Sequence, residues 1–217
     1  MISGNVVTSV IAAWVLLGIS ANASQLAPAN ISRLESNGLY SKVLTLCADD
    51  NSAKSLCIRG DYLYHGRKGI PADRVRGQEL YKKALAKILP AAEAGDIDAQ
   101  YWAARCLEYG VYDLKESRKW YVKSADAGNA KAMFKSAWFS AKRLGAVGTR
   151  FDGARGVAFR YAKAASEAGN ADGTALMAWL AYIDCRGERN FEKALPEIRK
   201  SVEGNSPLGK MLLGRMY

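Results

Sequence analysis

A short phrase recurs along the chain and fixes where helices must end and begin. The phrase, Ala-Gly followed by Asp or Asn, starts at Ala94, Ala127 and Ala168 and returns in altered form at Glu203. Its glycines are 33, 41 and 35 residues apart. Glycine ends a helix in the left-handed conformation, and Asp or Asn caps the start of the next one. The spacing therefore predicts a stack of helical hairpins.

The segments around each phrase have helical composition. Aromatic and basic residues precede it, as in 120–125 and 159–165, and alanine-rich segments follow it at 99–109, 132–144 and 173–184. Small residues recur where first and second helices must approach closely. We number the first helices from equivalent residues at position one: Ser55, Ala99, Ala132 and Gly173.

These repeats resemble the Sel1-like repeat family, a branch of the tetratricopeptide-like α-solenoids. The residues that match the family phrase are Gly60, Tyr64, Gly66, Gly69-Ile70, Asp73 and Tyr81-Lys82-Lys83-Ala84 in the first repeat, and Gly110-Val111 and Trp120-Tyr121-Val122-Lys123 in the second. The last residues, Leu213 to Tyr217, match the start of a further first helix. The resemblance implies an all-α, right-handed α-solenoid over residues 55–217, with four full repeats and a partial C-terminal one.

The repeats depart from the family pattern in several places, among them a shortened loop in the second repeat and Pro196-Glu197 in place of the aromatic pair in the fourth. An insertion at 85–91, which includes Pro90, is expected to lengthen the second helix of the first repeat. The third repeat is expected to have a long loop over 145–156.

The N-terminus predicts export. No charged side chain precedes Arg33, and an apolar run over 6–21 ends in the small residues Ala21-Asn22-Ala23. This pattern is typical of a signal peptide of residues 1–23, although residues 1–5 lack Lys and Arg. An uncleaved anchor or a buried helix is the alternative. We expect a periplasmic bacterial protein with no membrane span after cleavage, and a helical N-terminal cap at 24–54.

The four cysteines fit an oxidising compartment but allow three pairings. Cys47 and Cys57 flank a turn-like Asp49-Asp50-Asn51-Ser52 segment, so we expect a disulfide between them. Cys106 and Cys185 are as compatible with two buried thiols as with a bridge. No Cys-x-x-Cys pair occurs, and we expect no metal and no cofactor.

The sequence contains no recognisable catalytic motif. It has no Gly-x-Ser-x-Gly, no His-Glu-x-x-His and no Walker A phrase. Its single histidine, His65, stands beside Gly66 at the expected end of a first helix, where capping or exposure accounts for it. We therefore expect a protein that is not an enzyme and has no catalytic residues.

Positive charge is concentrated in one region. The chain carries a formal net charge of +10, and residues 111–164 hold twelve Lys or Arg against four Asp or Glu. Such a field favours an acidic protein partner. An anionic lipid surface, a polyanionic glycan or a simple solubilising face are the alternatives, and nucleic acid does not fit an exported chain.

Alignment of the first helices predicts a row of binding residues. Position seven holds Asp61, Arg105, Trp138 and Trp179, and position four holds Ile58, Trp102, Lys135 and Leu176. In such solenoids the first helices line the concave surface, and Trp and Arg are enriched at interface hot spots. The partner-binding residues expected from this alignment are Trp102, Arg105, Trp138, Trp179, Lys135 and Arg143. The alternative is that these tryptophans pack between neighbouring helices.

The resemblance implies a non-enzymatic scaffold that holds a partner protein on its concave face. Some exported members of the family are immunity proteins that sequester a type VI secretion lipase effector. Others belong to the flagellar motor or regulate the cell envelope, and related disulfide-rich repeat proteins are linked to β-lactam binding, which would make an enzyme acting on cell-wall material the alternative.

Overall fold

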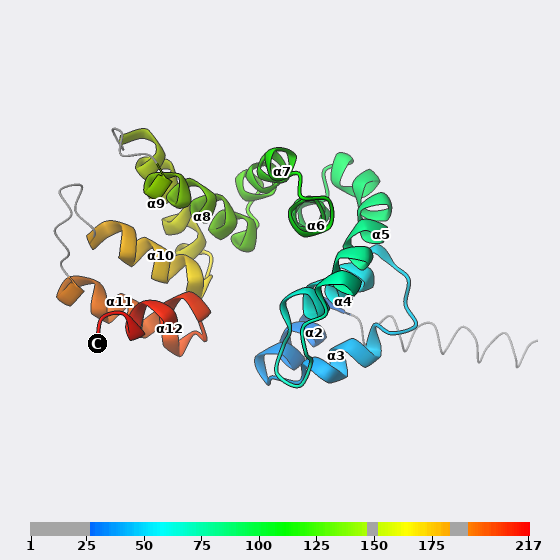
Figure 1. Cartoon of the computed structure of the whole chain (residues 1–217). Helices are drawn as coiled ribbons and strands as arrows, with labels where there is room; N and C mark the ends of the chain where they lie inside the picture. The colour runs from blue at the N-terminus through cyan, green and yellow to red at the C-terminus, as the bar shows by residue number, and fades with distance from the viewer. Residues whose placement is uncertain (1–26, 147–151, 183–190) are drawn as a thin grey trace, which may run out of the picture. The chain divides into compact units, whose positions relative to one another are not determined.

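The computed structural model describes residues 27–146, 152–182 and 191–217, and within these ranges the chain is helical with no β-strand. The elements are α2 (Pro28–Ser36), α3 (Tyr40–Leu46), α4 (Ala53–His65), α5 (Arg74–Glu93), α6 (Ile97–Cys106), η1 (Leu107–Val111), α7 (Leu114–Asp126), α8 (Ala130–Ala146), α9 (Asp152–Glu167), α10 (Ala171–Tyr182), α11 (Phe191–Glu203) and α12 (Pro207–Gly214). Figure 1 shows first helices (α4, α6, α8, α10, α12) alternating with second helices (α5, α7, α9, α11). The predicted all-α fold is confirmed.

Side-chain caps fix the register of the first helices. Each cap oxygen accepts a hydrogen bond from the backbone N–H three residues later. The cap residues are Ser52, Asp96, Asn129, Asn170 and Ser206. The amides they hold include those of Ser55, Ala99, Ala132 and Gly173, so the predicted alignment of first helices agrees with the structure.

Glycines in the repeated phrase make the turn before each cap. Gly95, Gly128 and Gly169 have φ values of 97°, 107° and 80°, which an L side chain rarely adopts. The last phrase differs from the prediction by one residue. There Asn205 takes the left-handed conformation, with φ of 60°, in place of Gly204. Asparagine tolerates this region better than most residues do, so the turn survives the change.

The described chain divides into two compact units. Of the described residues, one unit holds 27–87 together with 109–111, and the other holds 88–108, 112–146, 152–182 and 191–217. The core of the first unit contains Val43, Leu56, Tyr62 and Tyr81, all nearly inaccessible to solvent. It is built from α2, α3, α4 and the first part of α5.

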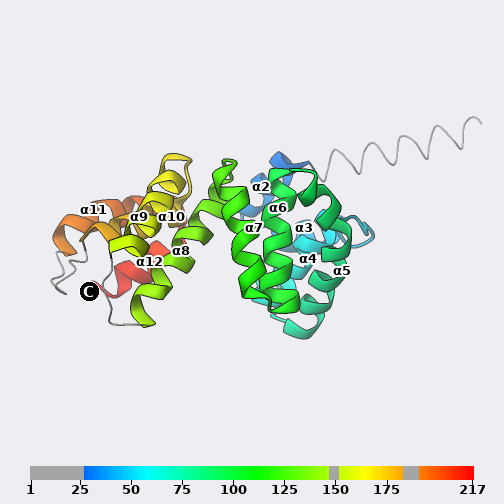
Figure 2. The same cartoon turned by 90° about the horizontal axis from the view of Figure 1, so that it is seen from above.

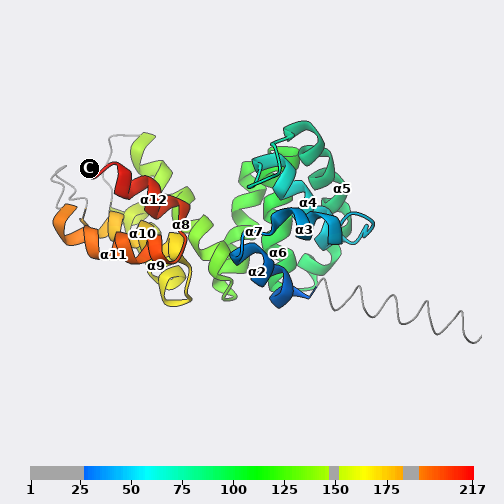
Figure 3. The same cartoon turned by 90° about the horizontal axis from the view of Figure 1, so that it is seen from below.

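In the second unit, buried serines of the second helix α7 form hydrogen bonds to the first helix α6. The hydroxyls of Ser117 and Ser124 on α7 donate to the carbonyl oxygens of Ala104 and Ile97 on α6, both at 2.8 Å. Further along, α10 packs against α9, α11 and α12 (Figures 2 and 3). Gly173 permits the close approach of α10 to α9, because a Cβ there would lie 2.5 Å from the Cβ of Ala165.

Two of the expected departures from the repeat pattern have different outcomes. The long second helix of the first repeat is confirmed, since α5 runs from Arg74 to Glu93 with Pro90 inside it. The long loop predicted over 145–156 is wrong at both ends, because α8 continues to Ala146 and α9 begins at Asp152. Between α6 and α7 the chain forms a single π-helical turn, η1, and Tyr112 follows it with φ of 63°.

The predicted disulfide between Cys47 and Cys57 is not formed in the structure. Cys47 ends α3 as a buried thiol beside Ser55, and burial raises the pKa of this thiol. Polar contacts close the turn instead, because the Ser55 hydroxyl donates to the Asp50 carboxylate at 2.6 Å. Cys106 is buried on α6, whereas Cys185 lies outside the described residues.

The predicted signal peptide, residues 1–23, also lies outside the described residues. Two short helices, α2 and α3, occupy the segment expected to form the N-terminal cap. Among the helices that the structure describes, none combines the length and the apolar character needed to cross a bilayer.

Candidate protein-binding face

The first helices of the second unit carry the predicted row at equivalent positions. Arg105, Trp138 and Trp179 each stand nine residues after the cap of α6, α8 or α10, and Trp102 and Lys135 stand six after theirs. Since the three caps have the same geometry, these side chains leave their helices at matching angular positions. The three tryptophans are half-buried, and Arg105 is buried.

Arg105 lies against two aromatic rings of its own helix. Its guanidinium carbon is 5.9 Å from the centre of the Tyr101 ring and 6.0 Å from that of Trp102. The two rings meet edge to face at 5.4 Å. With only 7% of its surface exposed, Arg105 differs from the exposed anchor that we expected. It holds the Trp102 ring in place through cation–π contact.

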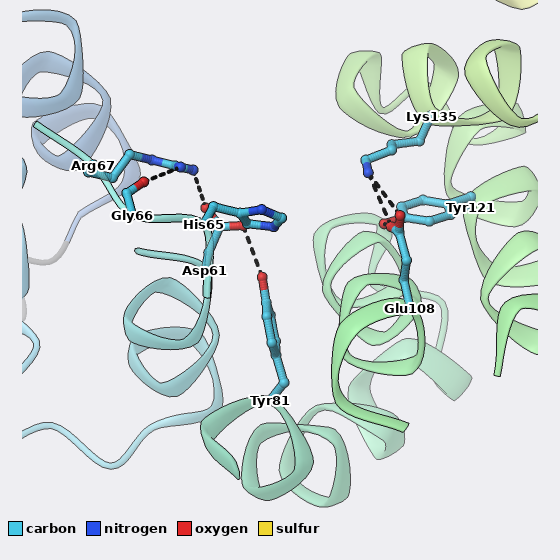
Figure 4. Close-up of polar contacts among 8 residues, drawn as sticks. All are labelled: Asp61, His65, Gly66, Arg67, Tyr81, Glu108, Tyr121 and Lys135. Atoms are coloured by element: carbon cyan, nitrogen blue, oxygen red, sulfur yellow. Dashed lines mark hydrogen bonds and ion pairs between the residues drawn. The ribbon is translucent and has the colours of Figure 1, made fainter. Parts of the chain in front are cut away.

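A largely buried ion pair lies at the same face and was not predicted. The Lys135 ammonium is 3.1 Å from Glu108 Oε2 and 3.2 Å from Oε1, and the Tyr121 hydroxyl donates to Oε2 at 2.6 Å (Figure 4). The Glu108 and Lys135 side chains are only 11% and 14% exposed. Burial, with the Glu108 charge, raises the pKa of Tyr121 well above its usual range. Glu108 follows Arg105 by three residues, so helical spacing was the one signal that could have placed it here.

Further rings and cations extend this arrangement onto α8. The Phe139 ring is 5.8 Å from Tyr121, and the Arg118 guanidinium of α7 lies 5.1 Å from the Phe139 ring centre. Lys135 lies 5.8 Å from the Tyr121 ring centre. We call the set Tyr101, Trp102, Arg105, Tyr121, Lys135 and Phe139 the cation–aromatic layer.

The structure thus brings three of the six predicted residues into one cluster. Trp102, Arg105 and Lys135 belong to the cation–aromatic layer. Trp138 lies one turn beyond Lys135 on α8, where its ring is 6.2 Å from Phe134. Trp179 occupies the equivalent position on α10, which packs against α8. The side chain of Arg143 lies outside the described residues.

The first unit has a different polar cluster at the position equivalent to Arg105. There Asp61 accepts hydrogen bonds from the Tyr81 hydroxyl at 2.9 Å and from the Arg67 guanidinium at 2.5 Å (Figure 4). Arg67 also donates to the carbonyl of Gly66 at 2.8 Å. The nearest His65 nitrogen is 3.9 Å from the Asp61 carboxylate.

This cluster has the character of a structural ion pair. Asp61 is 7% exposed, and a buried carboxylate requires partners such as Arg67 and Tyr81. The exposed His65 ends α4 and meets the Tyr109 ring edge to face at 4.6 Å. Within the described part of the chain, no group of three or more His, Cys, Asp or Glu side chains is arranged to hold a metal ion.

Comparison with known proteins identifies the fold. The protective antigen c5321 of uropathogenic Escherichia coli, which displays an SLR fold, superposes with a TM-score of 0.51 and 22% identity over 80% of this chain and 43% of that one. The chain has the Sel1-like repeat fold. A Sel1 repeat protein from Oxalobacter formigenes is also similar, with a TM-score of 0.47 and 20% identity over 80% of this chain and 47% of that one.

The chain therefore spans less than half the length of either solved protein. No family model matches the sequence, and no curated protein is similar to it. The Sel1-like repeat fold is thus recognised through helix arrangement and register rather than through overall sequence similarity.

Proposed function

We propose that this protein is a non-enzymatic scaffold that holds a partner protein on the first-helix face of its second unit. The Sel1-like repeat fold is commonly a protein-interaction scaffold. The observation that carries the proposal is the placement of three half-buried tryptophans, Trp102, Trp138 and Trp179, on successive first helices in the register set by their caps.

The cation–aromatic layer suits this role because its side chains are already ordered. Trp102 is held by Arg105 and Tyr101, and Lys135 is held by Glu108. Tyr101, Arg105 and Tyr121 are buried, so the layer supports the half-buried Trp102, and a partner that docks on Trp102 meets a side chain that is already ordered. Half-buried tryptophans also keep apolar area available for burial, which is typical of hot spots.

The charge of the chain favours an acidic partner. Residues 111–164 carry twelve basic and four acidic side chains, and this excess would accelerate association with an acidic surface. The contribution is expected to lie mainly in the association rate, because Lys135 and Arg105 already contact groups of their own chain.

We further propose that the mature protein acts in a bacterial periplasm after loss of residues 1–23. A finer hypothesis, drawn from the family resemblance alone, is that it is an immunity protein that sequesters a type VI secretion lipase effector. Its basic charge suits a tight inhibitor of an acidic effector. A role in the flagellar motor or in envelope regulation is the alternative.

The test is affinity capture with residues 24–217 as bait, followed by binding measurements on the captured protein. Trp138→Ala and Trp179→Ala are each expected to weaken binding roughly thirtyfold, the loss typical of a hot-spot residue. Phe159→Ala, an exposed aromatic change on the second helix α9, is the matched control and should leave the affinity unchanged. Equal loss in the control, or no loss in either tryptophan variant, would show that the partner binds elsewhere.

A further inference from the structure

A different surface is exposed along α7, which is a second helix of its repeat. Its exposed side chains recur at helical spacing and form one stripe: Lys115, Arg118, Lys119, Val122 and Lys123. The other side of α7 is buried, with Ser117, Tyr121 and Ser124 packed into the second unit. We call the five exposed residues the α7 stripe.

The acidic groups of this helix are engaged by their own chain. Asp113 caps α7 by accepting from the Glu116 N–H at 3.0 Å, and Glu116 pairs with Lys119 at 2.7 Å. Asp126 accepts from the Tyr161 hydroxyl at 2.7 Å. These acids keep their charge, so the four cations of the stripe exceed them by one, and Asp113 and Asp126 lie at the two ends of the helix.

Apolar side chains are exposed among these cations. Val122 is 39% exposed, Leu114 is 44% exposed and Tyr112, directly before the α7 cap, is 58% exposed. The Lys123 ammonium lies 4.3 Å from the centre of the Trp120 ring, in a cation–π contact. The exposed side of α7 and the residues before it therefore combine cations with apolar side chains, and tyrosine is enriched at membrane–water interfaces.

We propose that the α7 stripe docks the protein on an anionic membrane surface. Its cations would be attracted by the negative surface potential of anionic lipid. The apolar side chains would enter the headgroup region between them. This surface lies outside the cation–aromatic layer apart from the Arg118–Phe139 contact, so the proposal does not depend on the partner-binding tryptophans. Its four cations are among the twelve basic residues of 111–164, and the test below decides between lipid and an acidic protein for them.

The test uses sedimentation of residues 24–217, the proposed mature protein, with phospholipid vesicles. Vesicles of phosphatidylcholine are compared with vesicles in which phosphatidylglycerol replaces a third of it. The wild type should bind the anionic vesicles, and binding should weaken as salt is raised. Lys115→Gln combined with Lys123→Gln should weaken binding roughly thirtyfold, since each lysine near an anionic surface contributes about a factor of five.

The control removes the same charge elsewhere. Lys200→Gln combined with Lys210→Gln changes exposed lysines of α11 and α12 and should alter vesicle binding by less than about threefold, because those helices are not proposed to touch the lipid. Equal losses in both double variants would overturn the proposal, as would failure of the wild type to prefer anionic vesicles. Stripe-dependent binding to poly-glutamate without binding to vesicles would also overturn it and would assign the surface to an acidic protein.

Discussion

Glu108 connects η1 to α7 and α8 at this face. Its carboxylate is buried between the Tyr121 hydroxyl and the Lys135 ammonium. Removing one member of a buried pair leaves an uncompensated charge, which costs more than the pair itself contributes. We expect Lys135→Met to lower the free energy of unfolding by about 3 kcal/mol. Urea denaturation measures this value.

The double variant provides the control. Glu108→Gln together with Lys135→Met removes both charges and should be less destabilised than Lys135→Met alone. If the double variant loses the sum of the two single effects, Glu108 and Lys135 are not coupled.

Tyrosine hydroxyls that donate to carboxylates predict a loss of stability at alkaline pH. Burial and neighbouring acids raise the pKa of Tyr62, Tyr121 and Tyr161. A raised folded-state pKa contributes stability that is present below the unfolded value of about 10 and is lost as the pH rises through the folded value. The unfolding midpoint should therefore decrease as the pH is raised above about 10. Tyr121→Phe should reduce the slope of this decrease with pH. An unchanged slope in that variant would contradict the assignment.

At the residue scale, sequence reasoning worked where one helix sets the geometry. Trp102, Arg105 and Lys135 were predicted to share a face, and they do share a cluster. Glu108 was missed because its partners come from two other helices, α7 and α8, whose rotation the pattern does not specify. The Cys47–Cys57 bridge was predicted from a short sequence separation, which does not show which groups fill a turn, and no disulfide joins these two residues in the structure.

At the scale of the element, two glycines of the α9–α10 hairpin have opposite surroundings. A Cβ at Gly173 would lie 2.5 Å from the Ala165 Cβ and 3.0 Å from two backbone atoms, whereas a Cβ at Gly156 meets nothing within 4 Å. Gly173→Ala should therefore destabilise the protein by about 2 kcal/mol, because α9 and α10 must separate. Gly156→Ala, in the exposed part of α9, should stabilise it by about 0.5–1 kcal/mol.

Thermal unfolding followed by circular dichroism distinguishes the two substitutions. Both replace the same residue type within the same hairpin, so helix propensity alone predicts the same sign for each. Stabilisation by both would show that α9 and α10 are not in close contact at Gly173.

Helix starts were predictable from sequence because their causes are local. The five caps act on amides three residues away, so the phrase itself carries the signal. The turn between α6 and α7 was less predictable, because η1 and the left-handed Tyr112 replace the glycines of the other turns. The division into two units also has no sequence signal, since it follows from packing along α5 and η1.

At the scale of the whole molecule, the N-terminal pattern predicts processing on export. Expression of the full gene in a bacterium should give a periplasmic product whose first residue is Ser24, because the apolar run ends in a small-x-small pattern at Ala23. Intact mass and N-terminal sequencing of the periplasmic fraction measure this. A product that retains Met1 and sediments with membranes would instead favour the uncleaved anchor.

The caps have a consequence for how such a chain can change length. The cap residue sets where each first helix begins. The residue nine positions after the cap therefore has the same orientation on its helix, whatever sequence precedes the cap. The extra residues within α5 illustrate this, because α6 still begins in phase with α8 and α10. Insertions before a cap can thus change the spacing between repeats without changing the position of each tryptophan relative to the start of its own helix.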